Sequence, residues 1–252
     1  MIRDSISLNL KLAFKEAGCP ICYLRSHAEG RYIRSLLHEY VNDWSSRRHI
    51  VESLGYCPRH VWQTGLFEAE KYGSPLGNTI IYEHLTRVVS GRMARYAQRV
   101  ARSSQSAWRR WLHRLLPRLG HFPLPDELRP QARCRVCQVG DNTESTHLQW
   151  LLDDLSLPED HFRHWYATSD GLCLSHLRQA LGMADRSHSA AVEFLLGSTQ
   201  ERLKVLQRDL GELDRKHSWQ HRHEEKSESE QNSWLRALNF FGGNPEDNLN
   251  DG

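Results

Sequence analysis

Hydrophobic positions recur every three or four residues along most of this chain. The clearest stretches are residues 31–44, 78–116, 145–155 and 189–216. This spacing places the apolar side chains on one face of a helix. The alternation of apolar and polar residues that marks a half-buried strand is almost absent. The pattern therefore predicts an all-α protein.

Two polar stretches divide the helical pattern. Residues 120–131 contain three prolines, which are typical of a loop between folded segments. Residues 222–231 carry no apolar side chain, a composition typical of disorder. We therefore expect a first helical repeat at 1–119, a second at 120–216 and a flexible tail at 217–252.

The tail contains one more apolar stripe, and it predicts a short amphipathic helix at 232–243. Its apolar side chains are Trp234, Leu235, Leu238 and Phe241, and two glycines follow them. A short apolar helix on a polar tether is the form of a ligand for a groove on a partner protein. Docking of the same helix on its own chain is an equal alternative.

Composition narrows the class of protein without naming a function. The chain has 252 residues, 39% hydrophobic and 25% charged, with a formal net charge of +2. Its apolar runs are far shorter than the roughly 18 residues that span a bilayer, and its first residues lack the apolar core of a signal peptide. We expect a cytoplasmic protein, in which the six cysteines serve metal ligation or redox chemistry rather than disulfides.

All six cysteines belong to two copies of one motif. The first copy is "CPIC" followed by "CPRH", and the second is "CRVC" followed by "CLSH". The copies lie about 115 residues apart, in register, so the chain contains an internal duplication. The motif residues are Cys19, Cys22, Cys57 and His60 in the first repeat, and Cys134, Cys137, Cys173 and His176 in the second.

The spacing of these residues is that of metal ligands. Two thiolates separated by two residues can hold one ion from a tight knuckle, and Pro58 suits the first position of a helix that Cys57 would cap. Cys57 and His60 then lie one turn apart on one face. Three thiolates and one imidazole form a closed set that suits structural zinc. We therefore predict two duplicated helical halves, each with a zinc knuckle clamped to a helix N-terminus, and two Zn²⁺ ions. An iron–sulfur cluster is the alternative.

These motifs resemble a family of uncharacterised bacterial proteins with paired CPxC and GxCxxH sequences. The resemblance covers roughly residues 13–180 and includes all eight motif residues. The second copy departs from it at Arg135 and Leu174, neither of which is a ligand. The family has no established activity, so the resemblance implies metal sites and no reaction.

A second feature is a run of arginines. Nine arginines and no acidic residue lie between Thr86 and Gly120. Those at helical spacing on one face are Arg92, Arg95, Arg99, Arg102 and Arg109. Such a face can contact nucleic-acid phosphates, a protein partner or anionic lipid, or it can simply be solvated.

No phosphate-binding loop, dinucleotide motif or hydrolase motif occurs in the sequence. Our main hypothesis is a non-catalytic, zinc-stabilised adaptor or regulator that holds a protein partner. It would use the arginine-rich helix or the side chains of Trp234, Leu238 and Phe241. The alternatives are a nucleic-acid-binding protein that uses the arginine-rich segment at 87–118, and an iron–sulfur or thiol redox protein.

Overall fold

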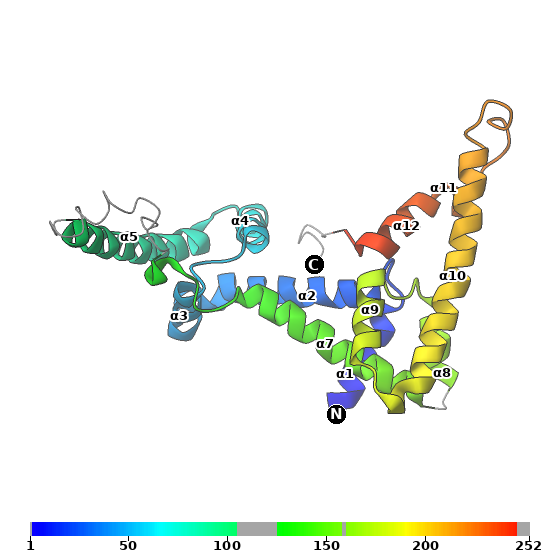
Figure 1. Ribbon diagram of the computed structural model, residues 1–252, viewed down its shortest axis with the longest axis horizontal. Helices are drawn as coiled ribbons and strands as arrows, with labels where there is room; N and C mark the ends of the chain where they lie inside the picture. Colours follow the sequence, from blue (N-terminus) through cyan, green and yellow to red (C-terminus); the bar gives the residue numbers. More distant parts are fainter. Residues whose placement is uncertain (1, 105–124, 158–159, 246–252) are drawn as a thin grey trace, which may run out of the picture. The chain divides into compact units, whose positions relative to one another are not determined.

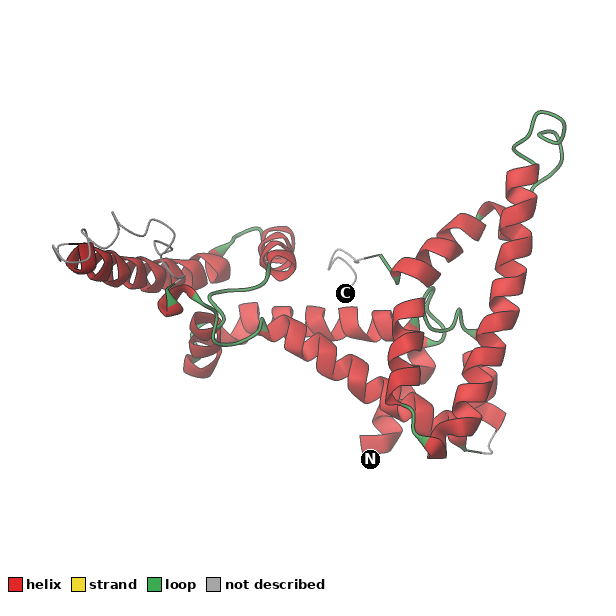
Figure 2. Ribbon diagram, in the orientation of Figure 1, coloured by secondary structure: helices red, strands yellow, loops and turns green. Residues whose placement is uncertain are grey.

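A computed structural model describes residues 2–104, 125–157 and 160–245, and these ranges are helical without any strand (Figures 1 and 2). The all-α prediction is confirmed. The first helices are α1 (Ile2–Ala13), α2 (Pro20–Ser35), α3 (Trp44–Glu52), α4 (Pro58–Tyr72) and α5 (Leu76–Ser104). The later ones are α7 (Arg135–Ser156), α8 (Asp160–Thr168), α9 (Leu174–Met183), α10 (Ser189–Arg215), α11 (Glu228–Gln231) and α12 (Ser233–Gly242). Short helical turns are η1 (Leu36–Tyr40), η3 (Asp126–Leu128) and η4 (Arg186–His188).

The chain divides into two compact units that do not follow the two repeats. Unit 1 combines residues 1–29 with 139–247, and unit 2 contains residues 30–138. Helices α2 and α7 each supply residues to both units. The boundary expected at residues 119 and 120 lies outside the described residues. Each unit draws on residues from both repeats.

The core of unit 1 is built on the apolar face of α7. Leu148, Leu151, Leu152 and Leu155 follow the helical spacing, and all four are fully buried. Tyr166 of α8 is also fully buried in this core. Removing such side chains from water is the main favourable contribution to folding, at about 25 cal/mol per Å² of apolar surface.

The core of unit 2 surrounds the end of α2. Ile33, Leu36 and Leu37 are buried there together with Phe67 of α4 and Ile81 of α5. The helix predicted at 31–44 is shorter than expected. α2 gives way to η1, and α3 starts afresh because the carboxylate of Asp43 accepts a hydrogen bond from the backbone N–H of Ser46.

The segment from residue 217 to 245, called the C-terminal arm below, packs on unit 1 instead of forming a flexible tail. α12 contacts both α9 and α10, and α11 contacts α10. Lys216 at the end of α10 pairs with Glu230 at 2.7 Å. The arm therefore docks on its own chain.

No helix within the described ranges is long and apolar enough to cross a membrane.

Candidate metal centres

Each motif places its ligands at the start of a helix. Cys57 and Cys173 are the N-cap residues of α4 and α9, with extended backbone at φ −65° and −67°. Cys19 and Cys134 directly precede α2 and α7 in the same way. The CxxC motifs are thus helix starts rather than separate knuckles, and the positive end of each helix favours the thiolate form of its cysteines.

The structure gathers the eight ligands into two groups, each drawn from both repeats. Site 1 contains Cys19, Cys22, Cys173 and His176, and site 2 contains Cys57, His60, Cys134 and Cys137. Our expectation that each repeat closes its own site is wrong, because the CxxC helix of one repeat meets the CxxH helix of the other. Site 1 lies in unit 1 and site 2 in unit 2.

Site 1 has the dimensions of a tetrahedral metal site. The Nδ1 atom of His176 lies 3.4 Å from the sulfurs of Cys19 and Cys22 and 3.2 Å from that of Cys173. The sulfurs of Cys22 and Cys173 are 3.9 Å apart. Bonds of about 2.3 Å to sulfur and about 2.1 Å to nitrogen give tetrahedral edges of about 3.6 Å (S···N) and about 3.8 Å (S···S). The four side chains therefore fit one ion.

Site 2 repeats this geometry. The Nδ1 atom of His60 lies 3.2 Å from the sulfur of Cys57, 3.5 Å from that of Cys134 and 3.3 Å from that of Cys137. The sulfurs of Cys57 and Cys137 are 3.6 Å apart. The donor set and its dimensions are thus shared by both sites.

The thiols within each site hydrogen-bond to one another. Burial and hydrogen bonds with Cys173 and Cys22 raise the pKa of Cys19 well above its ordinary value. Hydrogen bonds from Cys19 and Cys22 hold the pKa of Cys173 far below its ordinary value, despite burial. In this state one thiolate accepts hydrogen bonds from neighbouring thiols. A metal ion bound at the site would take the place of those thiol protons.

In site 2, as in site 1, one cysteine has a lowered pKa and another has a raised one. Burial would raise the pKa of Cys134, but a hydrogen bond with His60 lowers it to about 6. Burial and a hydrogen bond with Cys57 raise the pKa of Cys137 to about 12. Binding of a divalent ion at either site would thus release protons.

A carboxylate supports the histidine of site 1. The Nε2 atom of His176 lies 2.9 Å from Glu144, and the guanidinium of Arg25 donates to the same carboxylate oxygen at 2.6 Å. Burial acts to raise the pKa of Glu144, but the hydrogen bonds from His176 and Arg25 lower it below its ordinary value. An ionised carboxylate on Nε2 leaves Nδ1 as the metal-binding nitrogen. Our sequence analysis missed Glu144, although the duplication offers a signal: Glu29 stands at the matching position of the first repeat.

The end of the C-terminal arm lies against site 1. The side-chain oxygen of Asn244 accepts a hydrogen bond of 2.6 Å from the backbone N–H of Cys19, and its amide nitrogen donates to the carbonyls of Ala17 and Cys19. A Cβ atom on Gly243 would lie 3.1 Å from the sulfur of Cys22. Sequence reasoning also missed these two residues.

Three partly buried tyrosines lie near Cys134 of site 2. Burial raises the pKa of Tyr32, Tyr56 and Tyr82, that of Tyr82 to about 12, and the charge of Cys134 adds to this effect for all three. These phenols stay neutral at physiological pH. All three pack against the apolar cluster that includes Cys134.

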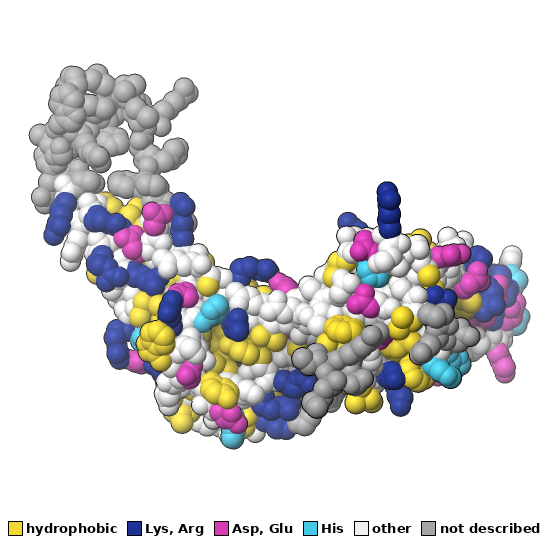
Figure 3. Space-filling model, turned by 90° about the horizontal axis from the view of Figure 1, so that it is seen from below, with side chains coloured by type: hydrophobic (Ala, Val, Ile, Leu, Met, Phe, Trp, Pro, Cys, Tyr) yellow, Lys and Arg dark blue, Asp and Glu magenta, His cyan; other side chains and the backbone are white. Residues whose placement is uncertain are grey.

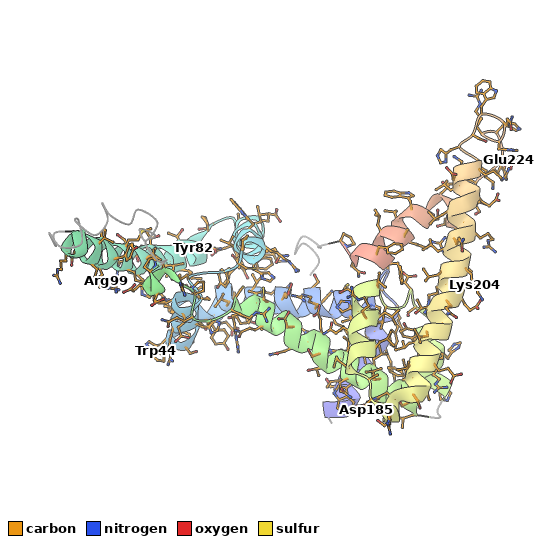
Figure 4. All side chains as sticks on the ribbon, viewed as in Figure 1. Trp44, Tyr82, Arg99, Asp185, Lys204 and Glu224 are labelled. Carbon is orange, nitrogen blue, oxygen red and sulfur yellow. The ribbon has the colours of Figure 1, made fainter. Side chains whose placement is uncertain are left out.

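The arginine-rich face on α5 is partly engaged with the chain itself. Arg92 donates to the backbone carbonyl of Glu127 at 3.0 Å, and Arg99 forms an ion pair with the Glu127 carboxylate. Arg95 and Arg102 are exposed. Figure 4 labels Arg99 on α5. Arg109 lies outside the described residues.

The apolar stripe of α12 faces outward, although the helix is docked. The exposed fractions are 52% for Trp234, 59% for Leu238 and 67% for Phe241. The docked side is polar, since Ser233 is fully buried and Arg236 pairs with Asp209 of α10 at 2.7 Å. The three candidate partner-binding side chains are therefore accessible.

Comparison with known proteins gives a family without a function. The sequence model of DUF6062, a family of unknown function, matches residues 4–248. An "Uncharacterized 23.9 kDa protein in xynA 3'region" of Caldicellulosiruptor sp. (strain Rt8B.4) is 24% identical over 230 residues, which cover 91% of this chain and 97% of that protein. No solved structure matches the chain.

Proposed function

Because the chain belongs to DUF6062, a family of unknown function, we propose its function from its geometry. It is a non-catalytic helical adaptor whose two units are each closed by a structural Zn²⁺ ion. It holds a partner protein through the exposed face of α12. The observation that carries the metal part is that each group of four ligand atoms lies within 4.8 Å of one another at two helix N-termini.

The donor set favours zinc over an iron–sulfur cluster. Three thiolates and one imidazole around a single tetrahedral position are a common set for structural zinc. A cluster is held by ligands on several different iron atoms, which spreads the ligands further apart than one shared ion requires. The spacing at both sites therefore supports a single ion.

The same donor set argues against catalysis at the metal. Catalytic zinc keeps one position open for water or substrate. Here four protein atoms fill a tetrahedron, so the ion contributes stability rather than a nucleophile. Free cysteines that serve as ligands are typical of a reducing compartment, and a cytoplasmic location is therefore part of the proposal.

The partner-binding role is supported by the outward apolar stripe of α12. Surface hydrophobic residues that occur singly need no explanation, but a row of them on one helix is typical of a helix that inserts into an apolar groove. Figure 3 views the molecule from below and shows hydrophobic side chains scattered among charged ones on that face; it does not identify those of α12. The stripe comprises Trp234, Leu235, Leu238 and Phe241, all of them exposed.

Nucleic-acid binding by α5 is the second candidate function. The exposed side chains of Arg95 and Arg102 favour it. The contacts of Arg92 and Arg99 with Glu127 count against it, because they already satisfy part of this basic face.

Two measurements test the proposed function. Native mass spectrometry of the full chain should show two zinc ions, and a brown protein with bound iron would contradict the zinc assignment. Affinity capture should then compare the parent with a triple variant of Trp234→Ala, Leu238→Ala and Phe241→Ala. A variant with Trp62→Ala and Leu66→Ala, two exposed side chains of α4, is the control.

We expect a specific partner to be lost with the α12 variant and kept with the α4 variant. An identical captured set for both would contradict the role of α12. A salt-dependent affinity for DNA or RNA that weakens when Arg95 and Arg102 become alanine would instead favour the second candidate.

A further inference from the structure

The C-terminal arm is held on unit 1 mainly by polar contacts. The carboxylate of Asp209 accepts hydrogen bonds from Ser229 at 2.5 Å and from Arg236 at 2.7 Å. The larger apolar side chains of α12 face outward, apart from Phe240, which lines a cavity beneath the helix. Little hydrophobic burial therefore holds α12 in place.

The cavity beneath α12 further reduces the packing that keeps this helix on unit 1. Its volume is about 400 Å³, and its walls come from α10, α12 and the residues around Cys19 and Cys173. Closely packed helices leave few voids larger than a water molecule. α12 thus spans an open space, with its first turn anchored on α10 and its end anchored elsewhere.

The second anchor is the backbone of site 1 itself. Asn244 bonds both the N–H and the C=O of Cys19, so its side chain follows the position of that ligand. Gly18, the residue before it, has φ +84°, and a Cβ there would lie 2.3 Å from the Asn244 side chain. The backbone N–H of Gly18 also donates to Asp170, at 2.6 Å. This close fit requires one conformation of residues 17–19.

That conformation depends on the ligands of site 1. A bound ion ties Cys19 and Cys22 to Cys173 and His176, which lie at the start of α9. Without the ion, the thiolates lose their common cation and the turn before α2 loses its constraint. The anchor for Asn244 would then no longer be fixed.

We propose that the metal at site 1 controls the docking of α12, so that its apolar face is presented in a fixed position only when site 1 is loaded. This inference rests on the proposed function, because it gives one of the two ions a regulatory role toward the partner surface. Site 2, in the other unit, plays no part in it.

Hydrogen exchange measured by mass spectrometry on the full chain tests this coupling, with the ion count taken on the same samples. Cys22→Ser removes a ligand of site 1, and Cys137→Ser, at the matching position of the second repeat, removes one of site 2. In Cys22→Ser the amides of 233–243 should exchange about tenfold faster or more, the effect of losing about 1.4 kcal/mol of local stability. In Cys137→Ser they should exchange as in the parent.

Two further variants separate the anchor from the fold of unit 1. Asn244→Ala should keep both ions and the protection of α10, yet speed exchange in α12. Gly243→Ala adds a methyl group at φ +81°, 3.1 Å from the sulfur of Cys22, and should do the same. Gly242→Ala is the matched control, because a Cβ there meets no atom within 4 Å.

The outcomes are distinguishable. Suppose that the parent binds two ions, but that α12 exchanges at the parent rate in both Asn244→Ala and Cys22→Ser. That result would overturn the coupling and leave the proposed zinc sites intact. Equal loosening of α12 by Cys22→Ser and Cys137→Ser would also overturn it. A parent with no bound metal would sink the zinc proposal itself and the coupling with it. If Cys22→Ser unfolds the whole of unit 1, the comparison of Asn244→Ala with Gly242→Ala decides the question.

Discussion

Site 1 and site 2 share their ligands and their helix ends, but they differ in what surrounds them. Site 1 has Glu144 and Arg25 behind its histidine and the end of the C-terminal arm against its cysteines. Site 2 lies beside three partly buried tyrosines. Equal donor sets can therefore serve different purposes in one chain.

The cores of the two units differ as well. Among the described residues, the buried cluster of unit 1 contains about twice as many side chains as that of unit 2. In the part of the chain that the structure describes, unit 2 thus has less hydrophobic burial to set against the conformational entropy of folding. We infer that unit 2 depends on its ion for folding, whereas unit 1 uses its ion chiefly to order the residues near the arm.

The largest effect is expected from variants that test the pairing of the CxxC motif of one repeat with the CxxH motif of the other. In the double variant of Cys22→Ser and Cys173→Ser both changes fall in site 1, so one ion should remain bound. In the double variant of Cys22→Ser and Cys57→Ser one change falls in each site, so both ions should be lost. Native mass spectrometry with a mild competing chelator counts the ions.

The alternative pairing predicts the reverse. If each repeat closed its own site, the first double variant would lose both ions and the second would keep one. The pair of variants therefore decides the connectivity, with the same number of cysteines removed in each.

Sequence reasoning found the helices and all eight candidate ligands, because helical spacing and a repeated motif are local signals. It missed the pairing because the two copies are in register and either CxxH can serve either CxxC. The chain between Cys22 and Cys173 is about four times as long as that between Cys22 and Cys57. Two doublings of loop length cost only about 1.2 kcal/mol, which is small beside a metal site.

The supporting residues were harder to predict for a different reason. Glu144 is a single acidic residue in an amphipathic helix, and only its hydrogen bond with a ligand gives it a role. Asn244 stands in a polar stretch after two glycines, where nothing in the sequence indicates a contact with residues more than two hundred positions earlier. Both depend on tertiary packing.

The second prediction compares the two histidines. His60→Ala should abolish cooperative folding of unit 2, because structural zinc contributes roughly 10–16 kcal/mol in small peptides while a domain has only about 5–15 kcal/mol of net stability. His176→Ala should leave the exchange protection of α7 and α10 largely in place. Thermal unfolding and hydrogen exchange of the two units measure the difference.

Leu36→Ala is the control in unit 2, since truncation of this buried side chain should cost about 2–5 kcal/mol. The loss of stability caused by His60→Ala should be larger than that caused by Leu36→Ala. A His60→Ala variant that melts like the parent and keeps two ions would contradict the ligand assignment, and equal effects of the two histidine variants would contradict the distinction between the units.

The third prediction addresses the carboxylate behind site 1. Glu144→Gln removes the charge that supports His176 and should weaken zinc binding at site 1 by about 10–100-fold, the usual effect of losing such a partner. Site 2 should be unaffected. Competition with a chromophoric chelator gives both affinities, and Glu39→Gln, at an exposed position, is the control. A change at both sites, or at neither, would contradict the assigned role.

The smallest effect is expected where the C-terminal arm meets α10. The hydrogen bond from Ser229, together with those from Arg236 and Arg208, outweighs burial and lowers the pKa of Asp209 to about 2. A depressed pKa means that this carboxylate stabilises the arm above its unfolded pKa of about 3.9, and that the contribution is lost as the pH falls from about 4 to about 2. Asp209→Asn removes the charge at neutral pH but keeps an acceptor oxygen, so it should cost only about 0.5–1.5 kcal/mol of local stability. The amides of α12 should exchange faster while both ions stay bound, because this contact lies at the other end of α12 from site 1.

Glu201→Gln is the control, because Glu201 is an exposed acid on α10, the helix that also carries Asp209, and it should leave the exchange of α12 unchanged. If Asp209→Asn also released the site 1 ion, the two ends of the arm would act as one anchor instead of two, and unit 1 would depend on its metal as fully as unit 2 does.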